Sequence, residues 1–314
     1  MSFTFLFPGQ GAQKVGMGAD FFNRFEFAKK RFEKAGELLG RDLAALCFEG
    51  PQQQLTETQN TQPALFVVES VISDVLIEHG LSPVVALGHS LGEYSALYAA
   101  GVFSFEDGLQ MVAKRGELMA QAGQKAPGSM AAVVGLDKEK IAQALEDVRG
   151  IVVPANENSP DQTVISGAVE AVAAAGEKLQ AAGAKRVIPL SVSGAFHSPL
   201  MQEAADEFAK VLDGVAFSDA RCPVITNVTA DAQTSGSELK KLLIKQLVSP
   251  VRWVDSMRVA ASHAQGRCLE VGPGNVLRGL ARKIDRSINV VSCESVDNVY
   301  SVVNSTKSQQ GEQA

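Results

Sequence analysis

The sequence predicts an α/β protein built on a parallel sheet, into which a smaller unit of different strand order is inserted. Short apolar runs, typical of strands buried on both faces, alternate along the chain with longer segments that have the composition of helices. Between residues 124 and 193 the strands and helices follow one another in the order βαββαβ. Alternating strands and helices place the chain in the α/β class.

The composition of the chain argues against several classes of protein before any motif is considered. The chain has 314 residues, 46% of them hydrophobic, which is enough for a sizeable core. Its net charge of −6 argues against nucleic-acid binding, and the four widely spaced cysteines predict reduced thiols, not a disulfide framework or a zinc site. Neither a signal peptide nor a membrane-spanning run is present in the sequence, so we expect a cytoplasmic protein that binds no membrane.

The predicted first strand, residues 3–7, ends at the loop Pro8-Gly9-Gln10-Gly11-Ala12-Gln13. Its glycines allow a phosphate-binding loop, although the Walker lysine and the full G-x-G-x-x-G pattern are absent. Alternatively, the loop brings a backbone N–H and a glutamine beside a nucleophile on a neighbouring strand. Helical segments are predicted over 19–49 and from Thr61 to about Gly80, with Pro63 near the first turn of the second segment.

Residues 84–100 are the most informative stretch of the chain. A buried strand is predicted over 84–87, Gly88-His89-Ser90-Leu91-Gly92 matches G-x-S-x-G, and 93–100 is compatible with a helix. Strand, tight glycine-flanked turn and helix are the context in which this pattern forms a nucleophile elbow. The turn places the Ser90 hydroxyl at a helix N-terminus, where backbone N–H groups favour negative charge. We therefore predict that Ser90 is a nucleophile, the alternative being an ordinary turn.

Arg115 lies on the next predicted helix, which begins at the cap Ser104-Phe105-Glu106-Asp107 and runs to about Ala122. On a helical wheel it falls within a broad apolar arc. The guanidinium needs a partner there, because an unpaired buried charge is costly. That partner is either an internal acid such as Glu93 or the carboxylate of a substrate, bound by both branches of the fork.

The βαββαβ order is that of a ferredoxin-like unit. It follows a joint that contains Gly123, Pro127 and Gly128, and it ends at Ser193-Gly194. Its strands are predicted over 129–136, 151–155, 163–166 and 185–190, and its helices over 138–148 and 169–182. We predict a large subdomain formed by 1–123 and 194–304, a small subdomain over 124–193, and a disordered polar tail over 305–314.

His197 follows the insertion in the segment Gly194-Ala195-Phe196-His197-Ser198. Of the four histidines it alone lies in a glycine-bounded loop at a domain junction, whereas His89 sits inside the elbow and is expected to point away from Ser90. His197 is therefore the best candidate for a general base. The rest of the chain predicts strands over 223–227, 268–271 and 289–293, and helices over 236–248, over 251–264 and after Gly272-Pro273-Gly274-Asn275.

Taken together, these motifs resemble the malonyl-CoA:acyl-carrier-protein transacylases of fatty acid synthesis. The resemblance covers about residues 3–300 and extends to Thr61-Gln62-Pro63-Ala64-Leu65, Asn227, Pro250-Val251-Arg252-Trp253 and Glu270-Val271-Gly272-Pro273-Gly274. It implies a hydrolase-like α/β core with a ferredoxin-like insertion. It also implies an acyltransferase that moves a malonyl group from malonyl-CoA to the phosphopantetheine thiol of holo-acyl carrier protein.

The resemblance implies a chemical role for five residues. Ser90 would attack the thioester, with His197 as general base and then general acid. The backbone carbonyl of Gln246 would orient the imidazole in place of a triad aspartate. The backbone N–H groups of Gln10 and Leu91 would form the oxyanion hole.

Substrate recognition is implied in the same way. Arg115 would receive the malonyl carboxylate, and the pocket would further be lined by Gln10, Gln62, Asn158 and Phe196. Exchanging a thioester for an ester and back is nearly balanced in free energy, so we expect no cofactor and no metal. Acyl carrier proteins are strongly acidic and need a basic patch; the candidates are Lys185, Arg186, Lys240, Lys241, Arg278, Arg282 and Lys283. Nothing in the sequence demands more than a monomer.

Two other functions fit part of the pattern. A serine esterase or thioesterase would use the same pair, Ser90 and His197, but a hydrolase of neutral esters has no use for Arg115 in its acyl pocket. A non-catalytic carrier-binding module would have no reason to keep both members of the pair. The sequence does not separate a transferase of fatty acid synthesis from one of polyketide synthesis.

Overall fold

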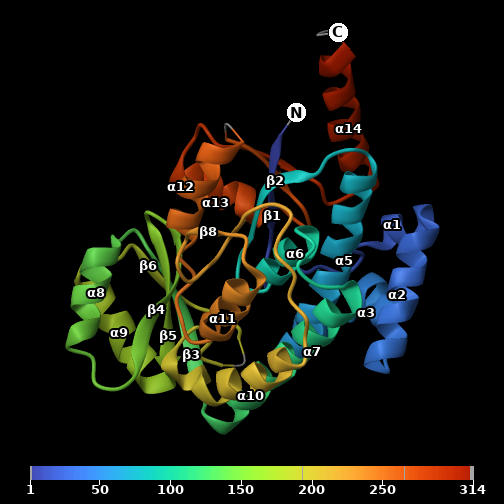
Figure 1. Ribbon diagram of the computed structural model, residues 1–314. Coiled ribbons are helices and arrows are strands. Elements are labelled where there is room, and N and C mark those ends of the chain that lie inside the picture. The colour runs from blue at the N-terminus through green and yellow to red at the C-terminus, as the bar shows by residue number, and fades with distance from the viewer. Residues whose placement is uncertain (1, 193, 265, 312–314) are drawn as a thin grey trace.

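The computed structural model describes residues 2–192, 194–264 and 266–311, and it contains two sheets with helices packed around them (Figure 1). The strands of the larger sheet are β1 (Phe3–Phe7), β2 (Pro83–Gly88), β7 (Val224–Ile225), β8 (Ala232–Gln233), β9 (Arg267–Glu270) and β10 (Asn289–Ser292). Their order is β10–β9–β1–β2–β7–β8. Pairing is parallel from β10 to β7, which confirms the predicted parallel sheet. The antiparallel edge strand β8 is not predicted by the sequence.

Helices cover both faces of this sheet because its strands are apolar on both sides. Phe5 and Phe7 of β1 belong to the main core, to which three long or central helices contribute: α5 (Thr58–Glu78), α6 (Gly92–Ala99) and α7 (Phe105–Lys125). Leu6, on the opposite side of the same strand, packs in a second cluster with residues of α12 (Trp253–His263) and α13 (Val276–Ile284). The two clusters explain why the central strands are uninterrupted apolar runs.

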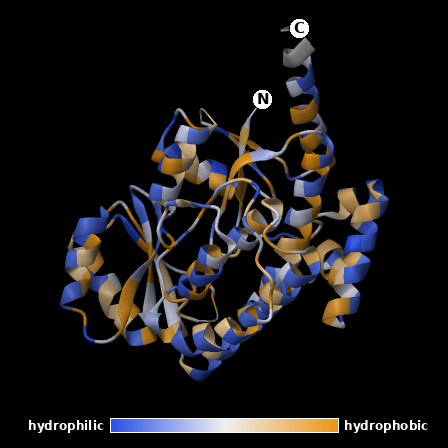
Figure 2. Ribbon diagram, in the orientation of Figure 1, coloured by the Kyte–Doolittle hydropathy of each residue, from blue (hydrophilic) through white to orange (hydrophobic). Residues whose placement is uncertain are grey.

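The remaining helices lie around the main core. They are α1 (Ala19–Arg24), α2 (Glu26–Leu39), α3 (Leu43–Glu49), α4 (Gln52–Thr56), the 3₁₀ turn η1 (Pro199–Met201), α10 (Gln202–Asp213), α11 (Gly236–Gln246) and α14 (Val296–Gly311). The helical segment predicted over 19–49 is thus divided into three helices. Figure 2 shows hydrophilic residues on peripheral helices such as α2, as expected for amphipathic helices at a surface.

Helix α5 begins at Thr58 and not at Thr61 as predicted, so Pro63 is an interior residue of the helix. A proline inside a helix leaves the carbonyl four residues earlier without its usual donor. That carbonyl belongs to Gln59, and it accepts a hydrogen bond from Arg41 Nη2 at 2.8 Å. The arginine therefore replaces the missing backbone donor, which the sequence around Pro63 could not reveal.

The smaller sheet has the order β4–β5–β3–β6, antiparallel throughout, which is the interleaved order of a ferredoxin-like unit. Its strands are β3 (Gly128–Val134), β4 (Val152–Ser159), β5 (Gln162–Ala168) and β6 (Arg186–Pro189), and its helices are α8 (Lys138–Glu146) and α9 (Val169–Ala181). One face packs against these two helices, while Met130 and Ala132 on the other face join the main core (Figure 1). The predicted inserted sheet is confirmed.

The small sheet is joined to the segment before α12 through backbone hydrogen bonds. Val251 N donates to Ala155 O at 2.8 Å, and Glu157 N donates to Val251 O at 2.9 Å. The segment before α12 therefore pairs with β4 as a short parallel bridge. The division into subdomains at 123/124 and 193/194 stays a prediction, and Ser193 lies outside the described residues.

The disorder predicted for the tail from residue 305 is wrong for the part that the structure describes. Helix α14 continues to Gly311, and residues 312–314 lie outside the description. Val299, Val302, Val303 and Thr306 are all buried and follow one another at helical spacing, so one face of α14 is held against the core. Of residues 305–308 only Thr306 is buried, and the valines of this face precede the tail, so the sequence of the tail by itself looks polar.

The loops that leave the carboxyl ends of the parallel strands lie along one edge of the sheet. Those loops follow β1, β2, β7 and β9. In open α/β sheets this is the edge at which ligands bind. Among the described helices, none is both long and apolar enough to cross a bilayer.

Candidate active site

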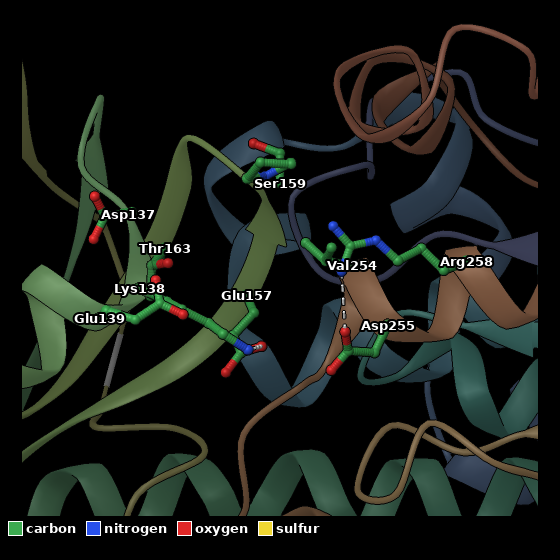
Figure 3. A pocket seen from close by; sticks show the side chains of 10 residues that line it. Asp137, Lys138, Glu139, Glu157, Ser159, Thr163, Val254, Asp255 and Arg258 are labelled. Carbon is green, nitrogen blue, oxygen red and sulfur yellow. Dashed lines mark ion pairs between the residues drawn. The ribbon is translucent and has the colours of Figure 1, made fainter.

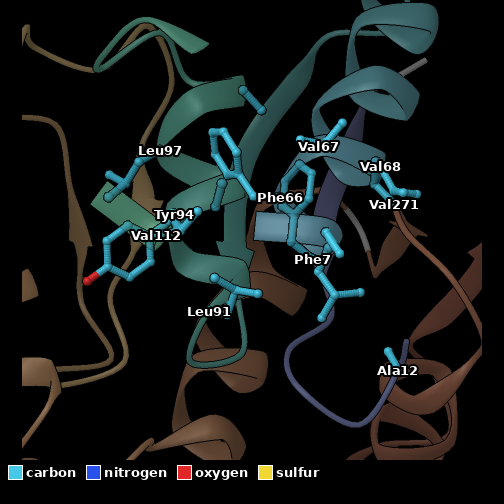
Figure 4. Packing of buried hydrophobic residues seen from close by; sticks show 14 of the residues in the cluster. Phe7, Ala12, Phe66, Val67, Val68, Leu91, Tyr94, Leu97, Val112 and Val271 are labelled. Carbon is cyan, nitrogen blue, oxygen red and sulfur yellow. The ribbon is translucent and has the colours of Figure 1, made fainter. Parts of the chain in front are cut away.

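Ser90 lies in the turn between β2 and α6, with a φ of +53°. Two glycines make this turn sterically feasible. A Cβ on Gly88 would lie 1.9 Å from Gly92 C, and a Cβ on Gly92 would lie 2.0 Å from Phe7 O. The elbow is buttressed by Leu91 and Tyr94, which belong to the same buried cluster as Phe7 (Figure 4). The predicted strand–turn–helix context of G-x-S-x-G is therefore present.

The backbone of the elbow is held by a side chain to which the sequence assigns no role. Asn227, in the loop after β7, accepts a hydrogen bond from Ser90 N at 2.7 Å through Oδ1. Its Nδ2 donates to Gly88 O at 2.7 Å. One amide thus satisfies both backbone groups of a left-handed turn that the helix and sheet ladders leave unpaired.

His197 meets Ser90 as the sequence predicts. Ser90 Oγ lies 2.7 Å from His197 Nε2, although 107 residues separate them. His197 Nδ1 faces two backbone carbonyls, Gln246 O at 2.9 Å and Ser249 O at 3.2 Å. Because carbonyls only accept, Nδ1 carries the proton and Nε2 is free to accept one from the serine. The carbonyl of Ser249 is not predicted by the sequence.

The environment of His197 keeps it neutral. Burial, followed by the charge of Arg115, lowers the pKa of His197 to about 3. The imidazole is therefore an available base throughout the neutral pH range.

Arg115 is 1% exposed and its fork is held by neutral groups. Its Nη1 donates to Gln62 Oε1 at 2.8 Å, and its Nη2 donates to Gln246 Oε1 at 3.0 Å and to Ser90 Oγ at 3.1 Å. Within the described part of the chain, no carboxylate lies at ion-pair distance from it. The structure therefore does not contain the internal salt bridge to Glu93 that the sequence left open. Instead, the guanidinium points at Ser90 Oγ, the candidate nucleophile.

The loop after β1 packs directly against the elbow. His89 N donates to Phe7 O at 2.9 Å, and a Cβ on Gly9 would lie 2.3 Å from His89 O. The next residue, Gln10, and Leu91 at the start of α6 each present a backbone N–H for which the described residues offer no hydrogen-bond acceptor. The side chain of Gln10 is tied separately, because its Nε2 donates to Thr58 Oγ1 at 3.2 Å.

The three other pocket candidates lie at different places. Gln62 is buried beside Arg115, and its Nε2 also contacts Met119 Sδ at 3.4 Å. Asn158 Oδ1 lies 2.8 Å from His89 Nε2, so it connects β4 to the elbow. Phe196 is 6% exposed and packs in the main core next to the proposed base.

A groove of about 290 Å³ opens between the small sheet and α12 (Figure 3). None of the predicted site residues lines it. Acidic side chains outnumber basic ones among its lining residues, which are Asp137, Lys138, Glu139, Glu157, Ser159, Pro160, Thr163, Val254, Asp255 and Arg258. In the described ranges, no group of three or more His, Cys, Asp or Glu side chains is placed to hold a metal ion.

Comparison with known proteins gives a consistent result. Residues 4–305 match the family described as acyl transferase domain. Two malonyl CoA-acyl carrier protein transacylases are each 42% identical to this chain: that of Bacillus subtilis over 307 residues (97% of both chains) and that of Synechocystis over 302 residues (96% of this chain, 100% of the relative).

Two solved structures have the same fold. An acyl carrier protein S-malonyltransferase from Vibrio cholerae superposes with a TM-score of 0.92 at 43% identity, covering 96% of this chain and 100% of its own. A malonyl-transacylase in complex with its type II PKS acyl-carrier protein superposes with a TM-score of 0.94 at 40% identity, covering 97% and 100%. The family match spans the elbow, the insertion and the loop that contains His197, and the relatives align along nearly their full length. This chain therefore belongs to the acyl transferase domain family.

Proposed function

We propose that this protein transfers the malonyl group from malonyl-CoA to the phosphopantetheine thiol of a holo-acyl carrier protein, through a malonyl ester on Ser90. The observation that carries the proposal is Arg115, a buried guanidinium with neutral amide partners and Nη2 at 3.1 Å from Ser90 Oγ. A carboxylate at the free end of the acyl group would complete its pairing. The relatives above are malonyl transacylases, which supports the same substrate class.

The first half of the reaction acylates the serine. His197 Nε2 takes the proton of Ser90 Oγ as the oxygen attacks the thioester carbonyl. The N–H groups of Gln10 and Leu91 bind the resulting oxyanion. When the tetrahedral intermediate collapses, the C–S bond breaks and His197 gives its proton to the departing CoA thiolate.

The second half runs the same steps with a different thiol. His197 takes the proton of the phosphopantetheine thiol, whose sulfur attacks the malonyl ester. The C–O bond to Ser90 breaks, and the imidazolium returns the proton to Oγ. Exclusion of water from the ester is what separates this transferase from a hydrolase. Bonds of similar energy are exchanged, so the chemistry requires neither a cofactor nor a metal.

Arg115 selects the acyl group by its charge. Burying the guanidinium disfavours its charged form, and burial is the main cause that lowers its pKa. The malonyl carboxylate offsets this penalty with a charge-assisted bidentate contact, whereas an acetyl group leaves the cation unpaired. Gln62 and Gln246 hold the fork in place from behind. We place Asn158 and Phe196 at the outer wall of the same pocket.

An acidic carrier would dock on basic residues that have no partner of their own. Three of the candidates are already engaged: Lys240 donates to Val215 O, Lys241 pairs with Glu238, and Lys283 pairs with Asp161. The exposed candidates without an ion pair in the described ranges are Lys185, Arg186, Arg278 and Arg282. The acid-rich groove beside α12 is unsuited to an acidic partner. We therefore place the carrier over β6 and α13.

Reversal of charge tests this docking surface. Arg282→Glu is expected to raise the KM for acyl carrier protein about tenfold and to leave acylation of Ser90 by malonyl-CoA unchanged, because the change lies outside the acyl pocket. Lys241→Glu, on a lysine already paired within its helix, is the matched control. Equal carrier kinetics in both variants would move the docking surface elsewhere.

The proposed reaction is tested by the intact mass of the protein after brief exposure to malonyl-CoA. The wild type should gain one malonyl group, Ser90→Ala should gain none, and Arg115→Ala should prefer acetyl-CoA. Release of free malonate without an adduct would instead favour a hydrolase. We further propose that the protein acts as a monomer in the cytoplasm, on a carrier of either fatty acid or polyketide synthesis.

A further inference from the structure

Glu93 is a buried carboxylate that the mechanism above does not use. It lies in the first turn of α6, three residues after the nucleophile, and is 1% exposed. Its Oε2 accepts a hydrogen bond from Gln246 Nε2 at 2.6 Å and another from Asn227 N at 3.1 Å. One donor comes from the end of α11 and the other from the loop after β7, so this buried carboxylate connects two segments that are distant in the sequence.

Both residues that Glu93 holds are in contact with the backbone of Ser90. Asn227 Oδ1 accepts from Ser90 N at 2.7 Å. Gln246 Nε2 donates to Ser90 O at 3.0 Å as well as to Glu93. The N–H and the C=O of Ser90 are therefore each bonded to a side-chain amide. Glu93 holds the amide of Gln246 directly, and it holds Asn227 through the backbone N–H of that residue.

Gln246 connects this arrangement to the other two functional side chains. Its Oε1 accepts from Arg115 Nη2 at 3.0 Å, and its backbone carbonyl accepts from His197 Nδ1 at 2.9 Å. An amide can turn over, but a carboxylate accepts only, so Glu93 holds the NH₂ end toward itself and the oxygen toward Arg115. In the reverse orientation the NH₂ group would face the guanidinium, with two donors opposed.

We propose that Glu93 is a positioning residue for malonyl transfer: through Gln246 and Asn227 its carboxylate aligns the Ser90 elbow and the Arg115 fork. The role rests on the proposed function. Loss of the Glu93 carboxylate is expected to lower both the rate of acylation and the preference for malonyl-CoA. The reason is that the amide of Gln246 contacts both Ser90 and Arg115.

The protonation state of Glu93 gives a readout that a purely structural role would not. Burial raises the pKa of Glu93 to about 7, while the donors Gln246 and Asn227 and the charge of Arg115 on α7 lower it. Tyr94, on its own helix, is the other titratable group that faces it. The carboxylate therefore becomes a neutral acid as the pH falls through 7, and hydrogen bonds to a neutral acceptor are weaker.

The test compares kcat/KM for acylation by malonyl-CoA and by acetyl-CoA, as a function of pH, in three variants. Glu93→Met removes the acceptor and is expected to lower kcat/KM for malonyl-CoA about 10- to 100-fold and to reduce the malonyl-to-acetyl preference. Glu93→Gln keeps one oxygen acceptor and removes the titration. In this variant, kcat/KM for malonyl-CoA should not change with pH near 7. Its value should equal the lower value that the wild type reaches below pH 6. Glu69→Gln, a matched change at another fully buried glutamate, should keep the wild-type profile.

Each outcome decides the proposal. Wild-type kinetics in Glu93→Met, or an unchanged inflection near pH 7 in Glu93→Gln, would overturn the positioning role even if the wild type forms the malonyl adduct. Absence of the adduct in the wild type would overturn the proposed function, and the positioning role with it. Because Glu93→Gln preserves the acceptor geometry, its profile remains decisive if Glu93→Met does not fold.

Discussion

At the scale of single residues, the decisive contacts are those of Arg115. Its hydrogen-bond partners are amide and hydroxyl oxygens, and among the described residues no carboxylate lies at ion-pair distance from it. This arrangement leaves the guanidinium available for the carboxylate of the proposed malonyl substrate. The position of Arg115 in the apolar arc of its helix is compatible with two partners, an acidic side chain of the protein or the carboxylate of a substrate. The distinction depends on Gln62 and Gln246, which lie 53 and 131 residues away in the chain.

Arg115→Lys is expected to lower kcat/KM for malonyl-CoA about 100-fold, because an ammonium group cannot bind a carboxylate bidentately while it contacts both glutamines. The rate with acetyl-CoA should change little, so the ratio of the two substrates is the measurement. A lysine variant that keeps full malonyl activity would show that only the charge, and not the fork, is required.

The sequence predicts the candidate catalytic side chains more completely than the side chains that position them. Ser90, His197 and Arg115 stand out because a glycine-flanked turn, a domain-junction loop and an apolar arc are local patterns. The side chains of Asn227 and Gln246 could not be found in this way, because each acts on the elbow from a loop or helix end that only the folded chain brings there.

At the scale of the elements, the turn between β2 and α6 requires glycines, because a Cβ at Gly88 or Gly92 would overlap neighbouring backbone atoms. Gly92 is in contact with the β1 backbone, whereas Gly279 on α13 has open space around it. Element ends are less predictable than their cores, as Thr58 at the start of α5 shows: the first turns of that helix are stabilised by contacts such as that of Arg41, not by a local cap. The two-residue strand β8 is likewise recognisable only through its pairing with β7, which the sequence does not predict.

Gly92→Ala and Gly279→Ala form a matched pair of helix glycines. The first is expected to destabilise the fold by roughly 3 kcal/mol or more, because its Cβ would overlap Phe7 O. The second should stabilise it by about 0.5–1 kcal/mol through helix propensity. Urea unfolding curves measure both, and a Gly92→Ala protein as stable as the wild type would contradict the steric account.

At the scale of the whole molecule, the site is formed by both halves of the interrupted core. The elbow comes from the first half, the base and its carbonyl partners come from the second, and the small sheet is bonded to both through Asn158 and Val251. The alternation of strands and helices and the inserted βαββαβ unit are predicted by the sequence. The backbone bridge between β4 and the segment before α12 is not, because it joins a strand to a loop.

Glu69 gives a prediction for the stability of the whole fold. It is fully buried, and burial raises its pKa well above 4.5, with further raising by Glu270. Its neutral form therefore stabilises the fold below pH 4.5, and this contribution is lost as the pH rises, because the unfolded chain ionises first. Relative to wild type, Glu69→Gln should gain up to about 1.4 kcal/mol of unfolding free energy per pH unit above 4.5. Denaturant curves at several pH values test this, and a constant difference would mean that Glu69 is ionised in the fold.

The strand order also has a consequence for synthesis of the chain. Strand β1 is central to the larger sheet, yet its neighbour β9 comes from residues 267–270. On the ribosome, one edge of Phe3–Phe7 therefore waits unpaired while most of the protein is made, which exposes an apolar edge to other nascent chains. Ser90 is translated long before His197 and Gln246, so a growing chain contains the proposed nucleophile before the proposed base and its carbonyl partner have been made.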